Sequence, residues 1–129
     1  MKGNNRETGT FYEKLAGAFL QEQGYQILEY NYRCKMGEID IIARHEGYLV
    51  FCEVKYRKNN KRGTPAEAVT LRKQRMISKC AMYYIMERGI PDIPCRFDVI
   101  GVLGYIGTGN DTNGEEQMQL IKDAFDFIS

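Results

Sequence analysis

The sequence lacks the residue spacing that a structural zinc site requires. It contains four cysteines and one histidine, and no two cysteines are separated by only two residues. Structural zinc sites collect four ligands, commonly through paired Cys-x-x-Cys spacings. We therefore expect reduced thiols, partly buried in strands and a helix, and we expect His45 to be a solvated residue at a turn. The four thiols belong to Cys34, Cys52, Cys80 and Cys95.

The chain also lacks a long hydrophobic run and an excess of charge. No apolar stretch approaches the ~20 residues that span a bilayer, and the first ten residues are polar. These absences predict a cytoplasmic protein with no membrane partner. The formal net charge of +1 excludes a global electrostatic case for nucleic-acid binding. The 129 residues are expected to form a single domain over 1–129, with its core over about 6–105 and a C-terminal strand and tail over 106–129.

Two apolar segments around a short polar break form the most informative part of the sequence. Residues 38–44 and 48–57 are rich in Ile, Val and Phe, and residues 45–47, His-Glu-Gly, separate them. Such a pattern is typical of a β-hairpin. Alternation along the two strands predicts one apolar face that packs against a helix. That face comprises Ile39, Ile41, Ala43, Val50, Cys52 and Val54.

The opposite face of this hairpin changes character along its length. It is apolar near the turn, at Ile42, Leu49 and Phe51, and ionisable at the open end. A solvated strand would be polar along its whole outer face, and a core strand would carry no cluster of charges. The open end is therefore a candidate functional site. Its ionisable side chains are Glu38, Asp40, Glu53 and Lys55.

Asp40 and Glu53 share this face only if the turn has an even number of residues. A two-residue turn at Glu46 and Gly47 places them opposite each other, and it keeps the apolar face continuous, so we favour it. Two close carboxylates repel each other unless a cation joins them, and hard oxygen ligands suit Mg²⁺ or Mn²⁺. The pair therefore predicts a divalent-metal site with positions left for water and phosphate oxygens.

Lys55 lies two residues after Glu53 and would point towards the same site. Its ammonium would orient an attacking water or neutralise charge that develops on a phosphodiester in the transition state. The alternative is a simple ion pair with Glu53 or Asp40.

Asp40, followed by Glu53, Val54 and Lys55 on the next strand, resembles the core of the PD-(D/E)XK nuclease superfamily. One acidic residue two positions before a lysine is expected about once by chance in such a composition. A longer ordered set of segments is more specific, and it resembles the bacterial YraN-like family over about residues 6–105. These segments are Asn-Tyr-Arg at 31–33, Gly-Glu-Ile-Asp at 37–40, residues 51–57, residues 63–69, Lys73 and Phe-Asp-Val-Ile at 97–100.

This resemblance implies a restriction-endonuclease-like α/β sandwich, with a mixed sheet of about five strands, an antiparallel meander and helices on both faces. It implies a metal-dependent endonuclease with Asp40, Glu53 and Lys55 as catalytic residues, and with Glu13 as a further metal ligand beside Asp40 and Glu53. Capping of the first helix explains Glu13 equally well. A weaker resemblance to archaeal Holliday-junction resolvases suggests branched DNA as a substrate, and symmetric cutting of two strands would require a homodimer.

The superfamily also includes proteins that bind nucleic acid without cutting it, and a fold does not fix a function. A non-catalytic nucleic-acid-binding module of the same fold is therefore the first alternative. A protein–protein adaptor that uses the edge of the meander is the second.

A basic segment follows the hairpin. Nine lysines and arginines lie between residues 55 and 79, against the single acidic residue Glu67. Such a segment beside carboxylates suits a phosphate backbone, and the resemblance to resolvases favours DNA over RNA; a solvated charged surface is the alternative. Arg57 would alternatively brace the sheet, and Lys73 would alternatively be a surface lysine. The candidate nucleic-acid-binding residues are Arg57, Lys58, Lys61, Arg62 and Lys73.

Two helices are expected outside the hairpin. A capping pattern and a stop signal at Gly24 predict a helix over about residues 10–23, preceded by frayed residues. Residues 64–67, Thr-Pro-Ala-Glu, begin either one helix to residue 88 or a short turn that is followed by a second start at Thr70.

Three further strands are expected, over about residues 25–32, over 95–103 and, as a short strand, near 118–125. A long helix connects the strand at 48–57 to the strand at 95–103. These two strands are therefore expected to lie parallel in the sheet.

Overall fold

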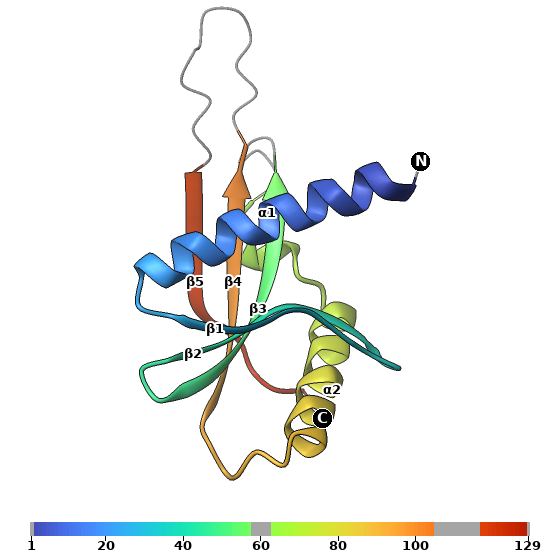
Figure 1. The fold of residues 1–129 in the computed structure, drawn as a ribbon, viewed down its shortest axis with the longest axis vertical. Helices are drawn as coiled ribbons and strands as arrows, with labels where there is room; N and C mark the ends of the chain where they lie inside the picture. Colours follow the sequence, from blue (N-terminus) through green and yellow to red (C-terminus); the bar gives the residue numbers. More distant parts are fainter. Residues whose placement is uncertain (1, 58–62, 105–116, 129) are drawn as a thin grey trace, which may run out of the picture.

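The computed structural model describes residues 2–57, 63–104 and 117–128, with side chains from residue 11 onward, as one β-sheet with two α-helices (Figure 1). No helix in these ranges has the length and apolar character needed to cross a bilayer. The elements in chain order are α1 Lys2–Glu22, β1 Gln26–Cys34, β2 Gly37–His45, β3 Tyr48–Arg57, the short 3₁₀ helix η1 Ala66–Ala68, α2 Leu71–Glu87, β4 Cys95–Leu103 and β5 Gln117–Phe125.

The five strands lie in sequence order across a single sheet. Neighbouring strands are antiparallel except β3 and β4, which are parallel because α2 carries the chain back to the same end of the sheet. The predicted mixed sheet of about five strands, its meander and its parallel pair are confirmed.

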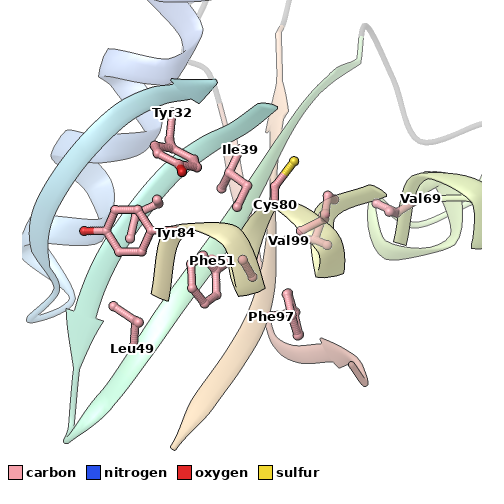
Figure 2. Close-up of a cluster of buried hydrophobic side chains, with 12 residues drawn as sticks. Tyr32, Ile39, Leu49, Phe51, Val69, Cys80, Tyr84, Phe97 and Val99 are labelled. Atoms are coloured by element: carbon pink, nitrogen blue, oxygen red, sulfur yellow. The ribbon is translucent and has the colours of Figure 1, made fainter. Parts of the chain in front are cut away.

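Each face of the sheet is covered by one α-helix (Figure 1). The cluster on the α1 face contains Ala16 and Leu20 from the helix, with apolar residues of β2, β3 and β4. The cluster on the α2 face contains Ile77, Cys80 and Tyr84 from the helix, with other residues of the same strands (Figure 2). Alternate residues of one strand point to opposite faces, so each central strand supplies both clusters. The predicted α/β sandwich with helices on both faces is confirmed.

A two-residue turn joins β2 to β3 and sets their register. His45 pairs with Tyr48, so the turn consists of Glu46 and Gly47, whose φ values are 50° and 83°. Two successive positive φ values are typical of the type I′ turn, whose twist matches that of paired strands. The predicted even turn is confirmed.

One predicted position on the hairpin is wrong. Ile39 packs in the α2 cluster together with Ile42, and it does not join Ile41 on the α1 face. The alternation breaks beside it, because Asn31 on β1 has a positive φ of 55° and the β1–β2 pairing skips Asn31 and Asp40. Asparagine tolerates this backbone conformation better than most residues do. The break frees Asp40 from the regular ladder.

The first helix begins earlier than expected and ends where expected. α1 starts at Lys2, so the prediction of a frayed segment and of a cap near residue 10 is wrong. The preceding residues are polar but include no proline, and polar residues can extend a helix that is anchored by its later turns. At the other end Gly24 has a φ of 93°, and the backbone N–H of Tyr25 donates to the carbonyl of Leu20 at 3.0 Å.

The second helix follows the two-start alternative. Thr64 and Glu67 form reciprocal bonds: the Thr64 N–H donates to Glu67 Oε1 at 3.0 Å, and the Glu67 N–H donates to Thr64 Oγ1 at 3.3 Å. This capping box starts only the three residues of η1. Thr70 then caps α2, because its Oγ1 accepts the N–H of Lys73 at 3.1 Å. The second cap fixes Lys73 in the first turn of α2.

Candidate active site

Asp40 and Glu53 lie where the β2–β3 ladder opens. Ile41 pairs with Cys52, and the next positions along the hairpin are Asp40 and Glu53. Asp40 Oδ2 accepts the backbone N–H of Val54 at 2.8 Å. This bond holds the carboxylate of one strand against the backbone of the other, so the position of Asp40 is fixed relative to Glu53.

Glu53 is a buried carboxylate with two cations beside it. Its side chain is 3% exposed, and its Oε2 lies 3.3 Å from Lys73 Nζ and 3.7 Å from Lys55 Nζ. Lys55 comes from β3, two residues further on, and Lys73 comes from the first turn of α2. Both lysines are about one-third exposed, at 30% and 36%, so their ammonium groups lie between the buried carboxylate and solvent.

The two lysines do not fully balance the negative charge. Burial raises the pKa of Glu53, the hydrogen bond and charge of Asp40 raise it further, and Lys73 and Lys55 only partly oppose these effects. The resulting pKa is about 8. The pKa of Glu53 therefore stays raised although two ammonium groups lie next to it.

Glu13 reaches the same place from α1. Burial first, and then the charge of Asp40, raise the pKa of Glu13 to about 7, while a hydrogen bond with Asn31 opposes the rise. Asp40 thus lies between Glu53 and Glu13. We call Glu13, Asp40, Glu53, Lys55 and Lys73 the carboxylate site.

The donor set of the carboxylate site suits a single hard cation held by few ligands. Within the described ranges, no group of three or more His, Cys, Asp or Glu side chains could hold a metal ion. The pair formed by Asp40 and Glu53 remains, and Mg²⁺ usually takes only one or two protein carboxylates. The raised pKa values of Glu13 and Glu53 show crowded negative charge that a cation would relieve. The role of Glu13 as a third ligand stays a prediction.

The predicted phosphate-binding residues are distributed unequally. Lys73 lies in the carboxylate site, and Arg57 lies further along β3, where its Nη1 donates to the carbonyl of Gly63 at 3.1 Å. Arg57 thus bonds to the backbone of its own chain, which agrees with the bracing interpretation, while its contact with phosphate stays a prediction. Three predicted residues lie outside the described residues, namely Lys58, Lys61 and Arg62.

A second group of polar side chains lies on the α1 side of the sheet. Asp98 is fully buried, and Arg96 donates to it twice, from Nε to Oδ1 at 2.9 Å and from Nη2 to Oδ2 at 2.8 Å. The hydroxyl of Tyr25 donates to Asp98 Oδ2 at 2.6 Å. Arg96 Nη2 also lies 2.9 Å from His45 Nδ1. We call Tyr25, His45, Arg96 and Asp98 the Arg96 network.

The prediction of a solvated His45 is wrong. The side chain of His45 is 5% exposed and its ring stacks on Tyr25, with centroids 4.0 Å apart. Because arginine can only donate, Nδ1 of His45 accepts from Arg96, and Nε2, 3.1 Å from Glu46, carries the ring proton. One sequence signal of the buried Arg96 network was available. Arg96 and Asp98 are two charged residues, separated by one residue, on an otherwise apolar strand.

Most of this chain is similar to the proteins of one family. Residues 12–102 match the family described as "Uncharacterised protein family UPF0102". A UPF0102 protein of Lachnoclostridium phytofermentans is 49% identical over 124 residues, which cover 95% of this chain and 96% of the relative. A UPF0102 protein of Clostridium botulinum is 45% identical over 122 residues, covering 94% and 95%, and one of Syntrophus aciditrophicus is 45% identical over 123 residues, covering 95% and 91%.

Proposed function

This chain belongs to the uncharacterised protein family UPF0102, and we propose that it is a metal-dependent endonuclease. The family description assigns no activity, so the proposal rests on the carboxylate site. The observation that carries it is a pair of carboxylates, Asp40 and Glu53, held across an open ladder with two ammonium groups at the mouth. The alternating charge fits a phosphodiester approaching a cation site.

Asp40 and Glu53 would hold Mg²⁺ or Mn²⁺, with Glu13 as a neighbouring carboxylate. When bound, such an ion polarises a phosphoryl oxygen and lowers the pKa of a coordinated water. The chain contributes the position of the ligands: the Val54 N–H holds Asp40, and burial holds Glu53. Deprotonation of Glu53, whose pKa is about 8, is therefore coupled to cation binding.

The lysines would act on the substrate. Lys55 and Lys73 extend from the buried carboxylate towards solvent, where a phosphate group would arrive. With a cation held by Asp40 and Glu53, both ammonium groups would be available to bind phosphate oxygens or to orient the attacking water. Lys73 is held in place by the first turn of α2.

Nucleic acid is the proposed substrate, with DNA favoured over RNA. The basic residues between 55 and 79 lie next to the carboxylate site in the sequence and would follow the phosphate backbone. Branched DNA is the first substrate to test, by resemblance to junction resolvases, and symmetric cleavage would use a homodimer.

A nucleic-acid-binding module without turnover is the second candidate. The observation that favours it is that both ammonium groups already form ion pairs with Glu53, as they do in a purely structural cluster. In this case the basic residues would bind the backbone, and Asp40 would be dispensable for binding.

Cleavage assays test the proposal. Labelled branched, duplex and single-stranded DNA, and RNA, are incubated with Mg²⁺, Mn²⁺ or EDTA and with wild-type protein, Asp40→Ala, Lys55→Ala or the exposed control Asp92→Ala. We expect metal-dependent cutting that Asp40→Ala and Lys55→Ala abolish and Asp92→Ala retains. Binding without cutting in every variant would overturn the endonuclease and favour the binding module.

A further inference from the structure

Three sulfur atoms lie close together where the end of β1 meets α2. The Sγ of Cys34, the last residue of β1, is 3.4 Å from the Sγ of Cys80 on α2. The Sγ of Cys80 is also 3.6 Å from the Sδ of Met76. Both cysteines are free thiols. These contacts place two oxidisable groups within reach of each other.

The two thiols differ in their access to solvent. Cys80 is fully buried in the α2 cluster, where Figure 2 shows it among apolar side chains. Cys34 is only partly buried. A small oxidant can therefore reach Cys34, while the protein itself shields Cys80 from competing reactions.

We propose that Cys34 and Cys80 are a redox-active pair that forms a reversible disulfide and fastens α2 to the end of β1. This inference goes beyond the proposed function and does not depend on it. The two Sγ atoms, now 3.4 Å apart, must approach by roughly 1.3 Å to reach the length of a disulfide bond. Cys34 is followed directly by the β1–β2 turn, so the chain has freedom to adjust on that side.

The two surfaces that the bond would join are already in close contact. Gly37, which pairs with Cys34, lies so close to Met76 that an added Cβ would clash with the methionine side chain. Met76 and Cys80 are one turn apart on α2, so the same face of the helix meets the hairpin at both positions. The disulfide would need no new approach of the two elements.

Hydrogen peroxide is the proposed oxidant, and the reaction balances in two steps. The Cys34 thiolate attacks one peroxide oxygen, the O–O bond breaks, and Cys34 becomes a sulfenic acid while the leaving hydroxide takes up a proton as water. The sulfur of Cys80 then attacks the sulfur of Cys34, an S–S bond forms, the S–O bond breaks, and the Cys80 proton leaves in a second water. The two thiols lose two electrons, and peroxide gains them.

The order of the two steps follows from burial. Burial first, and then the hydrogen bond and charge of Cys34, raise the pKa of Cys80 to about 12, so Cys80 is a poor first nucleophile. Proximity compensates in the second step, because Cys80 is held next to the sulfenic acid as soon as it forms. A dithiol reductant reverses the bond by exchange.

The bond would act on the helix that serves the carboxylate site. Lys73 lies seven residues before Cys80, about two turns along α2. A disulfide at Cys80 would tie this helix to the sheet that carries Glu53. It would also close a long loop of the chain, which restricts the unfolded state.

The test oxidises the reduced full-length protein with hydrogen peroxide, alkylates the remaining thiols and maps the peptides by mass spectrometry. We expect a linked pair of peptides containing Cys34 and Cys80, lighter by two hydrogen atoms than the separate peptides. We also expect the melting temperature to rise by about 10 °C and to return after treatment with a dithiol.

Two variants complete the experiment. Cys34→Ser changes a partly exposed thiol and should abolish both the link and the rise in melting temperature, whereas Cys95→Ser changes an exposed thiol elsewhere and should leave both intact. Alkylation of Cys34 and Cys80 after oxidation would overturn the proposal. Accumulation of sulfinic acid at Cys34, or a dominant link through Cys95, would overturn it as well.

Discussion

The protein contains buried carboxylates in two regions that compensate their charge differently. In the Arg96 network, Asp98 receives two bonds from Arg96, one from Tyr25 and one from the backbone N–H of Asp123 at 3.0 Å. In the carboxylate site, Glu53 has two lysines but also Asp40 beside it. Asp98 and Glu53 are buried to a similar degree, but the negative charge of each is compensated differently.

The difference appears in the titration of each region. Hydrogen bonding to Asp98 raises the pKa of Arg96, so this guanidinium stays charged. Glu53 is raised to a pKa of about 8 because burial and Asp40 outweigh the lysines. The first region has the properties of a structural brace. The second has unbalanced negative charge, which is what a cation site needs.

Removing Asp98 should have the largest effect on stability. Asp98→Ala leaves the buried guanidinium of Arg96 without its partner, which should lower the free energy of unfolding by about 3–5 kcal/mol. Urea denaturation measures the change, and Asp92→Ala, at an exposed aspartate, should change it little. A loss below about 1 kcal/mol for Asp98→Ala would contradict the structural role of the network.

Removing the charge of Glu53 should raise the free energy of unfolding, whereas removing Asp98 lowers it. The pKa of Glu53 is raised from 4.5 to about 8, so the folded state binds this proton more tightly than the unfolded state does. In metal-free buffer this contribution to stability is complete below about pH 4.5 and is lost as the pH rises through about 8. At pH 9, Glu53→Gln should be more stable than wild type by about 2–4 kcal/mol.

Urea denaturation of wild type and Glu53→Gln between pH 5 and pH 9 measures this effect as a change in the denaturation midpoint at constant slope. The exposed control Glu22→Gln should follow the wild-type pH dependence. If the stability of wild type and of Glu53→Gln changed with pH in the same way, the result would contradict a raised pKa of Glu53.

Removing Lys73 should have a moderate effect on the pH dependence of activity. The charge of Lys73 lowers the pKa of Glu53, so Lys73→Met should raise that pKa and move the rising limb of the pH–rate profile to higher pH. Cleavage near pH 7.5 should fall about tenfold, which corresponds to about 1.4 kcal/mol. Arg75→Met, at an exposed position on the same helix, should keep the profile, and an equal shift in both variants would argue for a general charge effect.

The turn between the strands should give the smallest effect. Gly47→Ala places a side chain at a φ of 83° in open space, so only the backbone cost of about 1 kcal/mol is expected. Thermal unfolding measures it, and Gly89→Ala, also at a positive φ in open space, should cost about the same. Cleavage by the folded protein should not change, because the turn is the end of the hairpin remote from Asp40. A change in metal dependence would contradict this separation.

The carboxylate site could be predicted because its geometry follows from short-range patterns. The register set by the two-residue turn places Asp40 next to Glu53, and Lys55 follows Glu53 by alternation along β3. Helical periodicity brings Lys73 to the sheet.

The Arg96 network could not be predicted in the same way. Its central bond joins Tyr25 to Asp98, which are 73 residues apart in the sequence, and no local period relates them. The misplacement of Ile39 has a similar cause, since it follows from the backbone of Asn31 on the neighbouring strand. Patterns within one strand cannot show a break that its neighbour imposes.

Binding of Mn²⁺ tests the central claim most directly. Titration calorimetry at pH 8 compares wild type, Asp40→Asn and Glu53→Gln with the exposed control Asp92→Asn, and repetition in buffers of different ionisation enthalpy reports proton release. The account predicts that Mn²⁺ binds wild type and the control with release of protons, and that Asp40→Asn and Glu53→Gln each weaken binding at least about tenfold. Equal binding by all four proteins, or none by wild type, would contradict a cation site at Asp40 and Glu53.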